Sequence, residues 1–182
     1  REIHQKYLAA GADIIETNTF SSQPISMSDY HIAEYSNEIT KAGCKIAREI
    51  ADEFTAIDPT KPRFVAGSIG PTNKACSISP DINNPAVRDI SFDEMVHAYK
   101  LQMTEMLLCD VDAFLIETIF DTLNAKAAIY AAEEAMNSIG KRIPLMLSAT
   151  IADTGGRTLS GQTLDAFVTS VKHADIFSIG LN

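Results

Sequence analysis

The stretch Asp112-Ala-Phe-Leu-Ile-Glu-Thr-Ile-Phe-Asp-Thr-Leu-Asn-Ala-Lys-Ala-Ala128 decides the fold that we expect for this chain. Its first half contains a short apolar run, residues 113–118, of the kind that forms a buried strand. Either Asp121 or Thr122 can cap a helix that begins directly afterwards, because both side chains accept hydrogen bonds from free backbone N–H groups. A buried strand followed at once by a helix is typical of the unit from which parallel sheets are built.

The same unit recurs along the 182 residues. Short apolar runs alternate with longer segments whose apolar residues recur at three and four positions, and this alternation predicts an α/β fold with a parallel sheet. Residues 11–17, 112–118 and 173–178 also resemble one another, as repeated units of a barrel or a doubly wound sheet would. Five units cannot close an eight-stranded barrel by themselves. The expected strands are residues 13–19, 64–70, 113–118, 144–150 and 175–182, and the expected helices are residues 2–10, 37–55, 92–109, 122–138 and 163–173.

The composition indicates one globular domain, or part of one, that acts on a small molecule. Hydrophobic residues make up 46% of the chain and charged residues 21%, which leaves enough apolar material for a core. The net charge of −9 is spread along the chain and argues against nucleic acid or an anionic membrane as a partner. No apolar run approaches the about 20 residues that cross a bilayer. Because the sequence starts without Met inside an expected helix, we expect it to be part of a longer protein.

The cysteines give no disulfide framework and no metal motif. Cys44, Cys76 and Cys109 are far apart and odd in number, which favours a reducing cytoplasm over secretion. Neither they nor the isolated histidines have the spacing of a zinc site, so we expect no metal ligand in the chain and expect the cysteines to be core residues. Phosphate-binding and nucleophile-elbow motifs are absent as well.

Polar residues follow the apolar part of every expected strand, where parallel α/β folds bind their ligands. Glu117 is the first candidate, because a ligand ammonium or a metal ion would stabilise a carboxylate at the end of an apolar strand. The alternative is that Glu117 pairs with a Lys or Arg side chain or accepts from backbone amides. Glu16 is a weaker candidate, since two inward carboxylates would repel each other. The other polar residues at these ends are Thr17, Asn18, Thr19, Ser68, Thr118, Ser148, Thr150, Ser178 and Asn182.

Two further features could complete a site. Asn18 and Thr19 offer uncharged groups that could hold a carboxylate or a carbonyl, although a turn held by Asx hydrogen bonds explains each of them on its own. The irregular stretches at residues 71–90 and 152–161 are too long to be simple connectors, so we expect them to be functional or to be ordered by a neighbour.

Five longer runs, residues 11–20, 65–73, 77–81, 116–128 and 156–162, are also informative as motifs. Together they resemble the homocysteine-binding domain of cobalamin-dependent methionine synthases, and the resemblance extends over essentially the whole chain. The Glu-Thr-Asn-Thr-Phe run at residues 16–20 is common to the wider homocysteine S-methyltransferase family. The Ser-Pro-Asp loop at residues 79–81 and the Phe-Asp-Thr-Leu-Asn-Ala-Lys helix start at residues 120–126 favour the cobalamin-dependent branch.

The resemblance implies a (β/α)8 barrel of which residues 1–182 form a partial homocysteine-binding domain with about the second to sixth strands. It also implies an activity, the transfer of a methyl group from methylcobalamin, recharged from 5-methyltetrahydrofolate, to the zinc-bound thiolate of homocysteine. Glu117 would bind the homocysteine amino group. The residues that would line the rest of the pocket are Asn18, Thr19, Ser148, Thr150 and Asn182.

The zinc ligands mark a departure from the family pattern. In the family, one zinc cysteine directly follows the Gly-Leu-Asn that stands here at residues 180–182, and two more follow near the last strand; none matches Cys44, Cys76 or Cys109. We therefore expect zinc and methylcobalamin to be bound by the parent protein and not by this chain, which alone should have no turnover. The expected partners are homocysteine and the folate, cobalamin and activation domains of the same parent chain, with neither nucleic acid nor a membrane among them.

Three alternatives stay open at this point. The chain could belong to a cobalamin-independent homocysteine S-methyltransferase that uses betaine or S-methylmethionine as donor. It could be a barrel lyase or aldolase in which Glu117 holds Mg²⁺, although the other strand ends carry Ser, Thr and Asn in place of further carboxylates or a Lys. It could also be a small-molecule-binding barrel fragment without chemistry of its own.

Overall fold

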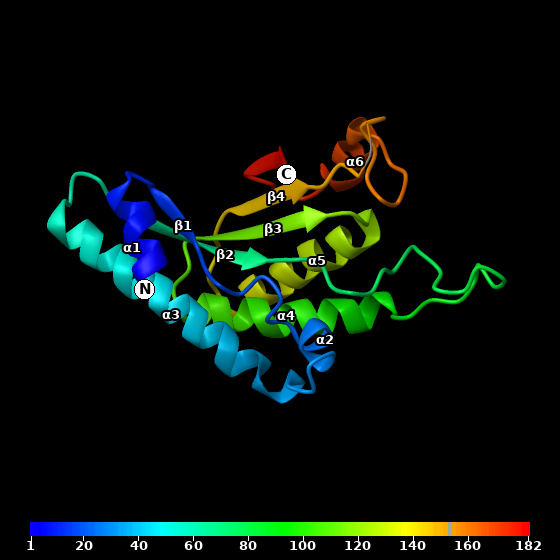
Figure 1. Ribbon diagram of the computed structural model, residues 1–182, viewed down its shortest axis with the longest axis horizontal. Coiled ribbons are helices and arrows are strands. Elements are labelled where there is room, and N and C mark those ends of the chain that lie inside the picture. The colour runs from blue at the N-terminus through cyan, green and yellow to red at the C-terminus, as the bar shows by residue number, and fades with distance from the viewer. Residues whose placement is uncertain (153) are drawn as a thin grey trace.

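Five parallel strands form one sheet in the computed structural model, which describes residues 1–152 and 154–182 (Figure 1). The strands lie in the sheet in the order in which they occur along the chain. A doubly wound sheet would reverse its strand order at some point, so the unbroken order identifies a barrel-type arrangement whose sheet is not closed. The strands are β1 Ile14–Glu16, β2 Phe64–Ile69, β3 Ala113–Ile119, β4 Leu145–Ala149 and β5 Ser178–Leu181.

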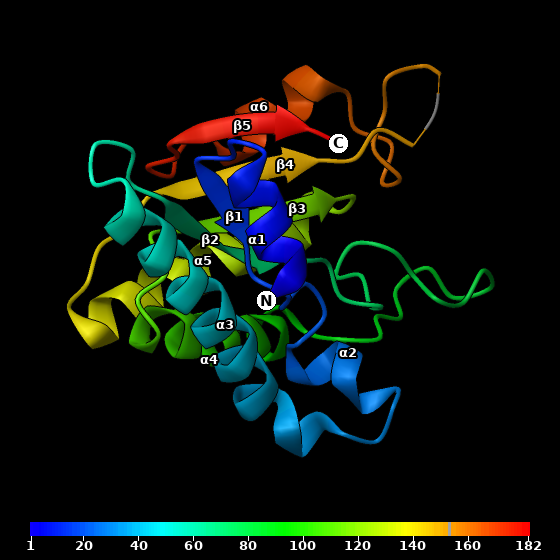
Figure 2. The same cartoon turned by 60° about the vertical axis from the view of Figure 1, so that its left-hand side comes forward.

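Helices connect the strands, and α3, α4 and α5 lie together along one face of the sheet (Figures 1 and 2). The helix at the N-terminus lies beside β1, and the last helix precedes β5 (Figure 2). Within the described residues no helix has both the length and the apolar character needed to cross a bilayer. The helices are α1 Glu2–Ala9, α2 Pro24–Ser28, α3 Ser36–Ile57, α4 Phe92–Leu108, α5 Thr122–Ile139 and α6 Leu164–Val171, with a short 3-10 helix, η1, at Ala33–Tyr35.

The register of the strands separates the two faces of the sheet. Ile69, Ile116 and Leu147 occupy one row across β2, β3 and β4 and are buried against the helices. Phe114, two residues before Ile116, points to the same side and is fully buried. The hydrophobic core therefore lies between the sheet and its helices. The strand residues that alternate with these core residues point to the opposite face of the sheet.

Side chains cap the amino ends of the two central helices. Ser91 begins α4 with a capping box, in which its hydroxyl accepts from the Glu94 amide and the Glu94 carboxylate accepts from the Ser91 amide. Asp121, and not Thr122, caps α5 by accepting from the first free amides. Gly140 ends α5 in the left-handed conformation that glycine adopts without strain.

Charged residues hold the amino ends of the strands. Asp112, just before β3, accepts from the backbone N–H of Val65 at 2.7 Å and from the Arg48 guanidinium at 2.6 Å. This carboxylate therefore ties α3, β2 and β3 together at the end of the sheet away from the expected ligands.

Three details differ from the expectation, and one is that the last strand begins at Ser178, three residues later than expected. The sequence did not indicate α2 or η1, because helices of five and three residues are too short to show an apolar period. The first strand also ends at Glu16, three residues early, because the chain then turns into a buried hydroxyl network beside β2.

Candidate functional site

The face of the sheet opposite the helices, the inner face, carries the candidate site. Ser68 and Leu115 share one row of this face, and Glu117 stands two residues beyond Leu115 toward the carboxyl end of β3. Ser148 and Gly180 pair across β4 and β5 and likewise lie two residues beyond the row of Ser68, which continues through Met146 and Ser178. Glu117 is therefore at the end of the sheet where parallel α/β folds bind ligands.

Glu117 is half-buried and accepts a hydrogen bond from the Ser68 hydroxyl at 2.5 Å. Ser68 is itself buried, so its hydroxyl fixes the orientation of one carboxylate oxygen. In the described part of the chain no Lys or Arg side chain forms an ion pair with Glu117. An ion pair with Lys or Arg, considered above for Glu117, is therefore not formed among these residues. The partner of Glu117 is instead Ser68, which the sequence did not single out.

Backbone strain marks the residue after Glu117. The pairing of β3 with β4 shifts register between Ile116 and Ile119, and Thr118 within this irregularity has a φ of 57°. A β-branched residue rarely adopts the left-handed region, and such strain costs about 1–3 kcal/mol and persists only where surrounding contacts hold it. Strained residues cluster at functional sites, and this one directly follows the candidate carboxylate.

Glu16 is exposed at the end of β1 and has a pKa that is raised above its ordinary value. Partial desolvation is the larger cause, and the negative charge of Glu117 adds to it. The repulsion expected between two inward carboxylates is thus present in the structure.

Three residues expected to line the pocket come together at the carboxyl ends of β4 and β5. The side-chain oxygen of Asn182 accepts from the Thr150 hydroxyl at 2.9 Å and from the Ser148 hydroxyl at 3.4 Å. Its side-chain amide donates to the Thr118 hydroxyl at 3.0 Å. Because Thr118 follows Glu117, this polar cluster is joined directly to the strained end of β3.

Asn18 and Thr19 are placed differently from each other. Asn18 is exposed, whereas Thr19 is buried and its hydroxyl donates to the Ser68 carbonyl at 2.8 Å. The hydroxyl of Thr17 in turn accepts from the Ser68 amide at 3.0 Å. Asn18 is thus exposed to solvent, whereas Thr19 is buried and holds the backbone of Ser68 through its hydrogen bond.

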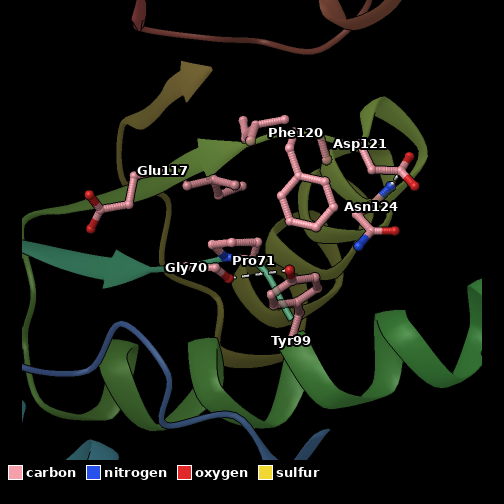
Figure 3. A pocket seen from close by; sticks show the side chains of 10 residues that line it. Gly70, Pro71, Tyr99, Glu117, Phe120, Asp121 and Asn124 are labelled. Atoms are coloured by element: carbon pink, nitrogen blue, oxygen red, sulfur yellow. Dashed lines mark hydrogen bonds between the residues drawn. The ribbon is translucent and has the colours of Figure 1, made fainter. Parts of the chain in front are cut away.

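The segment that follows β3 adds residues to the site, among them Asp121, which the sequence indicated only as a possible helix cap. Figure 3 shows a small pocket with Glu117 at one end and Asp121 and Asn124 at the other. Gly70, Pro71 and the ring of Tyr99 lie between them, and the Tyr99 hydroxyl donates to the Gly70 carbonyl. Asp121 and Asn124 are almost fully buried and accept hydrogen bonds from residues more than 40 positions away.

The described residues do not assemble a metal centre. Among residues 1–152 and 154–182, no three His, Cys, Asp or Glu side chains come close enough to hold one ion. Cys44, Cys76 and Cys109 are free and buried, as expected for core residues. The zinc that the sequence resemblance implies therefore has no fitting ligand set among these side chains.

Burial also makes the three thiols unreactive. Desolvation is the main cause that raises the pKa of Cys44 to about 12 and that of Cys76 to about 11, and it raises the pKa of Cys109 as well. At pH 8 the thiols of Cys44 and Cys76 are then almost entirely protonated, and only the thiolate reacts with alkylating reagents. We expect peptides with Cys44 or Cys76 to be alkylated by iodoacetamide at least about 100-fold more slowly in the native protein than in guanidinium chloride, and the peptide with Cys109 to be slowed as well. Mass-spectrometric mapping checks this, and native labelling at the denatured rate would contradict the burial.

Comparison with known proteins finds solved structures with a similar fold. The chain resembles the metallated form of the homocysteine methyltransferase MmuM from Escherichia coli, with 20% sequence identity and a TM-score of 0.78 over 100% of this chain. The oxidized form of the same protein has a TM-score of 0.77, also at 20% identity and with full coverage of this chain. A putative phosphonomutase from Burkholderia cenocepacia J2315 is less similar, at 12% identity and a TM-score of 0.52 over 98% of this chain.

At these identities, the structural similarities support the fold alone. The chain spans 61% of the length of the metallated MmuM chain, 60% of its oxidized form and 63% of the phosphonomutase. The sequence comparison is more specific, because the model of the family described as homocysteine S-methyltransferase matches residues 1–182. The chain therefore belongs to the homocysteine S-methyltransferase family.

Proposed function

We propose that this chain binds the amino-acid part of homocysteine for methylation of its thiol. The observation that carries the proposal is the half-buried carboxylate of Glu117, which has a hydroxyl donor and no described cation beside it. An ammonium group supplies both the charge and the additional donors that such a carboxylate lacks. The substrate ammonium is therefore a fitting partner for this side chain.

The polar groups around Glu117 suit the other end of a zwitterion. Ser148, Thr150 and Asn182 form an uncharged cluster next to it, and Asn18 is exposed at the end of β1. Hydroxyl and amide groups can donate to a carboxylate without adding a charge that would compete for Glu117. We assign the substrate carboxylate to these residues, and we assign Thr19 an indirect role through Ser68.

The reaction is a methyl transfer, in which the homocysteine sulfur forms a bond to the methyl carbon as the bond between that carbon and its donor breaks. The thiol proton is released. We propose methylcobalamin, recharged from 5-methyltetrahydrofolate, as the donor of the whole protein, with folate, cobalamin and activation domains as its further parts. The runs at residues 77–81 and 120–126 support this branch over betaine or S-methylmethionine as donor. The described side chains offer zinc no ligand set, and none of them is assigned to it.

The three free thiols fit a cytoplasmic location.

A donor comparison with the purified full-length protein tests the proposed function. Calorimetric titration with homocysteine should show binding, and methionine should form with methylcobalamin faster than with betaine or S-methylmethionine. Methionine formation from betaine or S-methylmethionine alone would keep the homocysteine site and overturn the donor. Absence of homocysteine binding would overturn the proposal itself.

Ser68→Ala tests how Glu117 is held. Loss of the hydroxyl removes the hydrogen bond that orients the carboxylate, so we expect the KM for homocysteine to rise about 5- to 10-fold, in line with about 1 kcal/mol for such a bond. Ser178→Ala is the matched control, because Ser178 lies on the same face in the row of Ser68 and makes no described contact with Glu117. Steady-state kinetics check both variants, and equal KM values in wild type and Ser68→Ala would contradict the orienting role.

A further inference from the structure

Two long loops meet at the short segment that follows β3. We call residues 120–124 the rim segment, since they lie just beyond the carboxyl end of the strand that carries Glu117. One loop, residues 70–91, joins β2 to α4, and the other joins β4 to α6. In parallel α/β barrels the loops at this end surround the ligand. The contacts of the rim segment therefore bear on the proposed site.

Asp121 uses its two carboxylate oxygens for different tasks. Oδ1 accepts from the Leu123 amide at 2.8 Å and caps α5. Oδ2 accepts from the Ser77 amide at 3.0 Å and from the Ser77 hydroxyl at 2.6 Å. A cap needs only one oxygen, so the second oxygen is committed to the β2–α4 loop.

Asn124 holds the same loop one turn further along α5. Its side-chain oxygen accepts from the Cys76 amide at 2.8 Å, and its side-chain amide donates to the Lys74 carbonyl at 2.8 Å. The exposed fractions of Asp121 and Asn124 are 1% and 4%, so water does not compete for these bonds. Together the two side chains form a tether to residues 74–77.

The tether is the last attachment of the loop before its outer part. From Ser77 to Asp89 every residue except Ser79 is exposed, and the chain returns to the core only at Ile90. Figure 1 shows this outer part extending away from the body of the molecule. Without the tether, the loop would have few contacts that fix its path over the strand ends.

The rim segment also contacts the second loop. The Phe120 carbonyl accepts from the Ser160 amide at 3.2 Å, and the Thr122 hydroxyl forms a hydrogen bond with the side chain of Gln162. Ser77, Lys126, Ser160 and Gln162 line a recess of about 260 Å³ between the two loops. Both loops thus form hydrogen bonds with the rim segment, which begins three residues after Glu117.

We propose that Asp121 and Asn124 are positioning residues for the methyl transfer, which hold the β2–α4 loop at residues 74–77 so that the donor meets the bound homocysteine in a productive orientation. This inference rests on the proposed function and assigns neither residue a contact with substrate. A misplacement of about 1 Å can lower the rate of a transfer reaction about 100-fold. Glu117 accepts from Ser68 and not from a tether residue, so we expect homocysteine to bind at Glu117 when the tether is broken.

Asp121→Asn separates the tether from the cap. The remaining carbonyl oxygen can still accept from the Leu123 amide, while the new NH2 group faces the N–H of Ser77 and cannot accept from it. Ser91→Ala is the matched control, because it removes a helix cap at the far end of the same loop without touching the tether. Both variants are made in the full-length protein and assayed with the methyl donor on which the wild type is active.

Three measurements decide the matter: amide hydrogen exchange, homocysteine affinity by calorimetry, and the rate of methyl transfer. In Asp121→Asn we expect faster exchange at residues 74–77, an affinity within about twofold of wild type, and a rate that falls about 10-fold or more. Ser91→Ala should leave the affinity and the rate unchanged. A wild-type rate in Asp121→Asn, unchanged exchange at residues 74–77, or an equal loss of rate in Ser91→Ala would overturn the inference. If the wild-type protein methylates no homocysteine, the proposed function fails and the catalytic role falls with it, while the exchange result still reports on the tether.

Discussion

Glu117→Gln is expected to weaken homocysteine binding by about 100-fold, or about 2.7 kcal/mol, with little change in the stability of the fold. The amide keeps the size of the side chain and can still accept from the Ser68 hydroxyl, so the local structure should persist. It removes the negative charge, and hydrogen bonds between ionised groups in a half-buried site are roughly twice as strong as neutral ones. Calorimetric titration of the full-length protein with homocysteine measures the loss.

Glu16→Gln is the control for general charge effects on the inner face. Glu16 is exposed and lies near enough to Glu117 for the negative charge of Glu117 to raise its pKa. Removing its charge should alter homocysteine affinity by less than about threefold, because a surface charge at this distance contributes little. If Glu16→Gln weakened binding as strongly as Glu117→Gln, the assignment of the ammonium to Glu117 alone would be wrong.

Asp112→Ala is expected to lower the free energy of unfolding by about 3 kcal/mol without changing the site. The substitution leaves the Val65 amide without an acceptor inside the sheet and leaves the Arg48 guanidinium without its shortest ion pair. An unsatisfied buried N–H costs about 1–3 kcal/mol, and the loss of a partly exposed ion pair adds to it. Denaturant unfolding of the purified protein measures the change.

Asp52→Ala is the matched control for that variant, because Asp52 pairs with the same Arg48 at 2.9 Å but is largely exposed. Its loss should cost less than about 0.5 kcal/mol. Asp112→Asn should fall between the two, since its carbonyl oxygen can still accept from the Val65 amide. Equal unfolding energies for Asp112→Ala and Asp52→Ala would refute the role given to Asp112.

The strands and long helices could be predicted because their signals are local. The apolar run before Glu117 predicted β3, and the recurrence of apolar residues at three and four positions predicted α4, because both patterns depend on residues close in sequence. The end of β1 could not be placed in this way. It depends on hydroxyl contacts between the chain after Glu16 and β2, about 50 residues further on.

The candidate site was predictable in its residue types and not in its contacts. Strand-end position was enough to single out Glu117, but the hydrogen bond from Ser68 depends on the register of β2 against β3. The position of Thr19 predicted a residue that lines the pocket, whereas in the structure its side chain is buried and its hydroxyl donates to the Ser68 carbonyl. Asp121 was expected as a cap, whereas its second oxygen reaches Ser77, which no local pattern reveals.

The most direct test of the ammonium site compares homocysteine with 4-mercaptobutanoate, which lacks only the amino group, in wild type and in Glu117→Gln. Calorimetry on the full-length protein gives the four dissociation constants, and their ratios isolate the coupling between the carboxylate and the ammonium. We predict that wild type binds homocysteine about 100-fold more tightly than the analogue and that Glu117→Gln binds the two within about threefold of each other. A Glu117→Gln protein that kept the full wild-type preference would contradict the account.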